Sequence, residues 1–136
     1  MNKDTTITSS IEDMRNNLRN LKANQSKKRR EYYNKHMEEA AQMYDNDWYN
    51  LRNAYIAEHP LCEIHEKFGV IKPAEEVHHK RIISSGYDKD AMRSLTLNEN
   101  NLMSLCKSCH RQLHKIAKER QLQYIDYCVP YELEKY

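Results

Sequence analysis

The spacing of four metal-binding side chains constrains the fold of this 136-residue chain more than any other feature. Three of its four cysteines and one histidine form two pairs, Cys62-x2-His65 and Cys106-x2-Cys109. A gap of two residues lets both side chains of a pair turn toward one ion, and two such pairs supply the tetrahedral set that zinc prefers. The four residues therefore predict a zinc site.

The predicted zinc has a structural role, because four protein ligands leave no open position for a substrate. The segment 61–115 contains few large apolar side chains, and segments this small usually need a metal or disulfides to stay folded. A disulfide alternative requires an oxidising compartment, and the initial MNKDTTITSS lacks the apolar core of a secretion signal. Chance pairing of buried cysteines, with His65 merely an exposed loop residue, is the other alternative.

Residues that form turns are scarce, since the chain has two glycines and three prolines. A β-sandwich or barrel needs a turn signal about every 8–12 residues, so a mostly helical fold is favoured.

No apolar run approaches the roughly 18 residues of a membrane span, which predicts a soluble, cytoplasmic protein. The 22 Lys and Arg residues are almost balanced by 20 Asp and Glu, so charge must be considered locally.

The first part of the chain is expected to form three helices. Ser10 and Asp13 resemble a capping box at the start of a helix that ends near Asn24. Its apolar side chains recur at steps of three and four residues: Ile11, Met14, Leu18 and Leu21. The basic run 27–30 then leads into a second periodic stretch, and a third helix fits 46–58 before Pro60. The basic run is interpreted as a solvated helix face, with a phosphate contact as the alternative.

The second part changes in character after Pro60. Short Val- and Ile-rich segments in 61–80 predict two short strands, and 84–101 is expected to be a polar loop. Helical spacing resumes from 105 to 125. We expect an N-terminal helical extension at 1–43, a central domain at 44–120 and a C-terminal tail at 121–136.

Five of the seven histidines lie after Pro60, and four of these five suggest a second metal site. His110 and His114 are four residues apart in a predicted helix, so both rings lie on one face. His78 and His79 lie in a predicted strand. Three imidazoles, those of His78, His110 and His114, suit a divalent ion that keeps open positions. His79 is then free to take a proton from water at neutral pH.

These residues carry a family resemblance. The set His78-His79, Asn101 and Cys106-x2-Cys109-His110 resembles the HNH nucleases, and WYNLRNAYIAEHPLCEIH is similar to small phage-encoded HNH endonucleases. The resemblance covers about 44–115, with NLMSLCKSCH as its most specific part. It implies an α+β, mostly helical fold, in which a ββα-metal HNH core stapled by structural zinc follows an N-terminal helical extension. The implied activity is metal-dependent hydrolysis of phosphodiester bonds in DNA.

The resemblance also implies roles for individual residues. His79 is the general base, Asn101 orients the base or braces its loop, and the catalytic metal ligands are His78, His110 and His114. The additional His114 is similar to the three-histidine site of the colicin-type DNase toxins. Phage members mostly carry cysteine at the position of His65 and often aspartate at that of His78. The all-imidazole set therefore leaves Mg²⁺, Mn²⁺, Ni²⁺ and Zn²⁺ open as the catalytic metal.

Local charge supports DNA as the partner. The segment 78–118 holds eight basic and three acidic residues, a local charge of +5. The expected phosphate contacts lie beside the proposed site residues: Lys80, Arg81 and Arg111. Resemblance to phage enzymes suggests genome packaging beside a terminase, with restriction-like cleavage and mobile-element homing as alternatives. The N-terminal helices offer a stripe for a homodimer or for docking on another partner. A zinc-stabilised nucleic-acid-binding module without nuclease activity is the alternative function.

Consecutive strand residues point to opposite faces, so His78 and His79 can share a site only at a strand end, twist or bulge.

Overall fold

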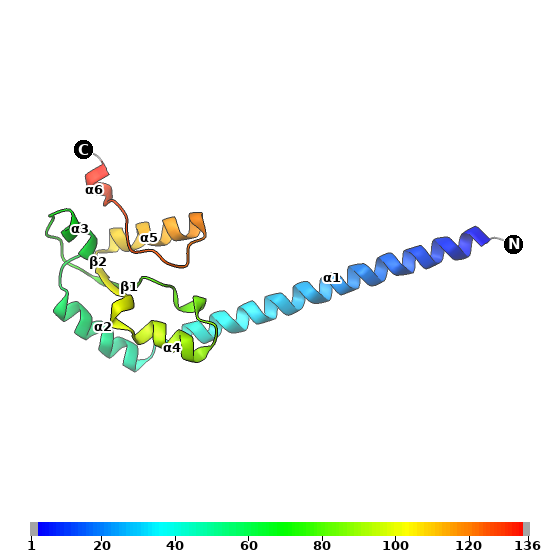
Figure 1. The fold of residues 1–136 in the computed structure, drawn as a ribbon, viewed down its shortest axis with the longest axis horizontal. Coiled ribbons are helices and arrows are strands. Elements are labelled where there is room, and N and C mark those ends of the chain that lie inside the picture. The colour runs from blue at the N-terminus through cyan, green and yellow to red at the C-terminus, as the bar shows by residue number, and fades with distance from the viewer. Residues whose placement is uncertain (1–2, 135–136) are drawn as a thin grey trace. The chain divides into compact units, whose positions relative to one another are not determined.

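The computed structural model describes residues 3–134, and its internal contacts divide the chain into Met1–Glu38 and Glu39–Tyr136. The described residues of the first unit belong to one continuous helix, α1 (Lys3–Ala41), coloured blue to cyan in Figure 1. The expectation of two helices separated near Asn24 was wrong, and Ser10 lies inside the helix instead of capping it. No glycine or proline interrupts 3–41, and the polar residues after Asn24 are compatible with a helix interior.

The expected apolar stripe of α1 is exposed. Four side chains, Ile11, Met14, Leu18 and Leu21, each expose between 45% and 62% of their surface. Most helical stability in proteins comes from packing of an apolar face, and this stripe has no packing partner among the described residues of its own unit.

The second unit contains five helices and a two-stranded antiparallel sheet in its described part. The strands are β1 (Glu76–His79) and β2 (Leu102–Leu105), with His78 opposite Met103 and His79 opposite Leu102. The helices are α2 (Asn46–Glu58), α3 (Glu63–Lys67), α4 (Lys89–Leu97), α5 (Lys107–Arg120) and α6 (Tyr131–Glu134). Figure 1 shows the strands between α5 and the pair formed by α2 and α4. The expected mostly helical α+β fold is therefore confirmed.

Helix α2 agrees with the sequence expectation for 46–58. Its N-cap is Asp45, however, whose carboxylate accepts a hydrogen bond from the Trp48 N–H at 3.1 Å, and Asn46 is the first helical residue. The helix ends at Glu58, just before Pro60, as expected for a residue without a backbone donor. Trp48 and Tyr55 are buried, so the predicted apolar stripe does face the core.

Two expectations for the middle of the chain were wrong. The segment 61–80 contains one strand instead of two: Leu61 forms only an isolated bridge with Pro73, and 63–67 is helical. The expected loop 84–101 contains α4, which Asp88 caps by accepting from the Ala91 N–H at 2.8 Å. Most polar residues of α4 lie on its solvent side, while Met92 is fully buried, which explains why composition suggested a loop.

The core of the second unit holds three clusters of buried side chains. One surrounds the cysteines, with Ile64, Leu105 and Leu113 fully buried. Another joins α2 to the sheet through Trp48 and Leu102. Within 3–134, no helix combines the length and apolar character needed to cross a bilayer. The boundaries expected at 43/44 and 120/121 stay predictions, although residues beyond 120, such as Ile125, pack into the first cluster.

Candidate active site and metal centre

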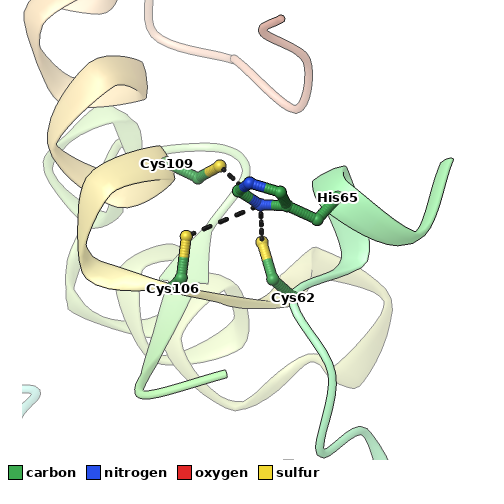
Figure 2. Close-up of side chains that lie close together, drawn as sticks. All are labelled: Cys62, His65, Cys106 and Cys109. Carbon is green, nitrogen blue, oxygen red and sulfur yellow. Dashed lines mark hydrogen bonds between the residues drawn. The ribbon is translucent and has the colours of Figure 1, made fainter. Parts of the chain in front are cut away.

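Two short chain segments bring the predicted zinc ligands together. Cys62 precedes α3 and His65 lies within it, while Cys106 caps α5 and Cys109 lies in its first turn. Figure 2 shows the His65 ring pointing at the three sulfur atoms. All four residues are buried, and their ligand atoms lie within 4.8 Å of one another. His65 is thus not the exposed loop residue of the alternative interpretation.

The distances fit a tetrahedral zinc. Nδ1 of His65 lies 3.3 Å from the sulfur atoms of Cys62 and Cys109 and 3.7 Å from that of Cys106. Zinc bonds of about 2.3 Å to sulfur and 2.1 Å to nitrogen place tetrahedral ligands about 3.6 Å apart. The hydrogen bond with Cys109, together with burial, raises the pKa of Cys62 to about 11. A divalent cation would compensate the cost of ionising such closely packed thiols.

The second nitrogen of His65 faces a carboxylate that sequence reasoning did not identify. Nε2 is buried and makes no hydrogen bond of good geometry, but Oε2 of Glu132 lies 3.4 Å away. Lys72 holds the other oxygen of Glu132 at 2.8 Å. A carboxylate on the second nitrogen of a metal-binding histidine orients the ring and raises its basicity. No periodic signal in the tail pointed to this contact.

The second histidine group also converges. Ligand atoms of His78, on β1, and of His110 and His114, on α5, lie within 4.8 Å of one another. Nε2 of His110 and Nε2 of His114 are 2.8 Å apart. Two ligands at right angles around an ion, with bonds of about 2.1 Å, are separated by about 3 Å. The three rings are therefore arranged to hold one ion while leaving further positions open.

Hydrogen bonds select the nitrogen that each ring presents. Nε2 of His78 donates to the backbone carbonyl of Ile125 at 2.8 Å, which leaves Nδ1 as its ligand atom. Nδ1 of His110 donates to Oε2 of Glu76 at 2.5 Å, which leaves Nε2. Burial lowers the pKa of His78 to about 4, so this ring is neutral at pH 7. Sequence reasoning missed Glu76, although it lies two residues before His78 and therefore on the same strand face.

His79 ends β1 and turns its ring to different neighbours. Its centroid lies 4.4 Å from that of Trp48, and its Nε2 donates to the Thr96 carbonyl at 3.1 Å. Burial lowers the pKa of His79 below its ordinary value, so the ring is neutral with a free Nδ1. His78 and His79 line the same cleft of about 340 Å³, together with His110 and His114. Their position at a strand end resolves the geometric difficulty of two consecutive residues in one site.

Asn101 and the three expected DNA contacts do not belong to the described lining of this cleft. The Asn101 amide accepts from the Arg81 N–H at 2.8 Å and donates to the Arg81 and Leu95 carbonyls, so it braces the loop after β1. Its described hydrogen bonds do not include one to His79. Arg81 lies over the Tyr124 ring at 5.4 Å, and Arg111 is exposed on α5. Among the described residues that line the cleft, Lys80, Arg81 and Arg111 are absent.

Comparisons with known proteins agree with this geometry. Residues 61–115 match the family model described as HNH endonuclease. The chain is also similar to the crystal structure of the HNH endonuclease of deep-sea thermophilic bacteriophage GVE2 with manganese ion. The two share 27% identity at a TM-score of 0.58, over 67% of this chain and 95% of the phage enzyme. No curated protein matches the chain significantly. Residues 61–115 are therefore an HNH endonuclease domain, and the chain is a nuclease enzyme.

Proposed function

We propose that this nuclease is a metal-dependent endonuclease that hydrolyses phosphodiester bonds of DNA in the cleft beside β1. The observation that carries the proposal is the convergence of His78, His110 and His114 next to His79, whose Nδ1 is free. A divalent ion bound to the three imidazoles would polarise a phosphate oxygen and stabilise the departing 3′ oxygen. Manganese in the similar phage enzyme supports Mn²⁺, and Mg²⁺, Ni²⁺ and Zn²⁺ remain candidates.

In this mechanism His79 is the general base. The Thr96 carbonyl holds the proton of His79 on Nε2, so Nδ1 carries the lone pair that accepts a proton from the attacking water. Trp48 packs on the ring and restricts its rotation. Asn101 acts indirectly, because it fixes the backbone of the loop that follows His79. A zinc held by Cys62, His65, Cys106 and Cys109 would keep α3 and α5 together and would leave no open position for the chemistry.

The remaining parts of the proposal concern partners. Lys80, Arg81 and Arg111 contact DNA phosphates outside the cleft and supply salt-dependent affinity. A second copy of the chain covers the stripe on α1. The exposed side chains at 11, 14, 18 and 21 are separated by alternating steps of three and four residues, which is the spacing of a coiled coil. Similarity to a phage enzyme supports action in the cytoplasm of a host cell and a role in genome packaging beside a terminase.

Plasmid nicking tests the proposal. Purified protein is incubated with supercoiled plasmid and Mg²⁺, Mn²⁺, Ni²⁺ or Zn²⁺ in turn. The unmodified chain is expected to nick with at least one ion, and His79→Ala is expected to lose nicking while retaining one bound zinc. DNA binding without nicking under all four ions would instead support the alternative, a zinc-stabilised nucleic-acid-binding module. That alternative accounts for the zinc ligands but gives no role to the free Nδ1 of His79.

A further inference from the structure

One arginine in the cleft forms no ion pair with the described carboxylates. Arg52, on α2, is half-buried and lines the cleft together with His78 and His110. Its guanidinium donates to the side-chain oxygen of Asn53 at 3.2 Å and to the backbone carbonyl of Glu75 at 3.3 Å. Both acceptors are neutral, and within residues 3–134 no carboxylate oxygen lies within 4 Å of its nitrogen atoms. A half-buried cation of this kind is best compensated by an anionic ligand.

Arg93, by contrast, has two carboxylate partners. Arg93 donates to Asp45 at 2.6 Å and to Asp47 at 2.7 Å, so its charge is used to join α4 to the start of α2. Arg52 has no such partner and is the only lysine or arginine among the described residues that line the cleft. The catalytic cleft therefore contains a single permanent cation, which is separate from the exposed basic residues proposed to bind DNA.

The backbone bond of Arg52 also determines where its charge lies. The acceptor, the Glu75 carbonyl, adjoins Glu76, whose carboxylate holds His110. The guanidinium is thereby tethered to the residue just before β1, and it lines the same cleft as the three imidazoles. Two of its five N–H donors account for the two hydrogen bonds, and the others are available to phosphate oxygens in the planar arrangement that guanidinium favours.

We infer that Arg52 binds a non-bridging oxygen of the scissile phosphate and stabilises the negative charge that grows there in the transition state. This inference rests on the proposed function, because it assumes phosphodiester hydrolysis in this cleft. A prepositioned donor aimed at developing charge contributes more to the transition state than to the bound substrate. Loss of Arg52 should therefore lower kcat much more than it raises KM.

The test compares Arg52→Gln, Arg52→Lys and the control Arg120→Gln, which removes an exposed arginine at the end of α5. Cleavage of a duplex oligonucleotide is measured with the divalent ion that best supports nicking by the unmodified chain. Arg52→Gln is expected to lose about 100-fold in kcat with KM changed less than threefold, and Arg52→Lys to recover part of the rate. Inorganic phosphate should inhibit the unmodified chain and inhibit Arg52→Gln much more weakly. Arg120→Gln should behave like the unmodified chain.

The possible results separate a failure of the proposed function from a failure of the role inferred for Arg52. If the unmodified chain does not cleave with any ion, the proposed function fails. If it cleaves and Arg52→Gln stays within threefold of its kcat, the role of Arg52 is refuted while the proposed function stands. Equal losses in Arg52→Gln and Arg52→Lys, with a lower Tm and unchanged phosphate inhibition, would show that Arg52 only tethers α2 to Glu75, which also refutes the inference. A selective loss of kcat at unchanged Tm and zinc content supports it.

Discussion

Glu76 offers the sharpest test of how the strand supports the metal site. Substitution Glu76→Gln keeps the shape of the side chain but removes the charge that faces Nδ1 of His110 at 2.5 Å. A carboxylate in this position orients the ring and strengthens it as a ligand. We therefore expect Glu76→Gln to weaken binding of the catalytic metal while leaving the structural zinc in place.

The size of the effect follows from the exposure of the pair. Removing a partner of this type typically costs 10- to 100-fold in metal affinity, or about 1.4–2.8 kcal/mol. The side chains of His110 and Glu76 expose 20% and 36% of their surface, so solvent screens part of the interaction. We therefore expect Glu76→Gln to lower the affinity for the metal by about tenfold, the lower end of this range.

Manganese binding provides the assay, because free Mn²⁺ can be followed by electron paramagnetic resonance while zinc gives no signal. Zinc-loaded protein is titrated with Mn²⁺, and the dissociation constant is compared among the unmodified chain, Glu76→Gln and the control Glu75→Gln. The Glu75 carboxylate accepts from the Lys107 N–H at 3.1 Å and is exposed, so this neighbouring substitution should leave Mn²⁺ affinity unchanged. Equal dissociation constants for Glu76→Gln and the unmodified chain would refute the role assigned to Glu76.

Three further outcomes are expected. Because burial lowers the pKa of His79, this proposed base should become protonated on Nδ1 only below pH 6.5. The acid limb of a kcat–pH profile should therefore lie below that value. Cys106→Ser should lose zinc and unfold, measured by metal content and circular dichroism, whereas Cys128→Ser, at a buried cysteine outside the ligand set, should retain one zinc. Leu18→Asp should convert a dimer to a monomer in sedimentation velocity, with Ala23→Asp as the control outside the stripe; a monomeric unmodified chain would contradict the proposed dimer.

Sequence reasoning was most successful where the relevant geometry is local. A gap of two residues brings Cys106 and Cys109 into one candidate metal centre, and a spacing of four positions brings His110 and His114 to one helix face. The same local rules identified α2, with Pro60 soon after its end. They failed for α4 because its polar side chains were taken as loop residues, although most of them lie on its outer face.

The contacts that define the chemistry of the site were not accessible in this way. The Ile125 carbonyl selects the ligand nitrogen of His78, and the Thr96 carbonyl selects the free nitrogen of His79. Backbone carbonyls carry no residue-specific signal, so no sequence pattern distinguishes these two from the others. Likewise, the unbalanced charge of Arg52 becomes visible only when its acceptors, Asn53 and the Glu75 carbonyl, are known.

By itself, the sequence determined which side chains could bind metal, since short spacings and helix periodicity limit where those side chains can point. It also carried the family resemblance, which the comparison over 61–115 confirms. Only the tertiary structure decided that His79 shares a cleft with His78 despite following it in the strand, because the strand ends there and Trp48 and Thr96 receive its ring. Tautomers, supporting carboxylates and unpaired charge depend on contacts between segments far apart in the chain, and those contacts exist only in the folded protein.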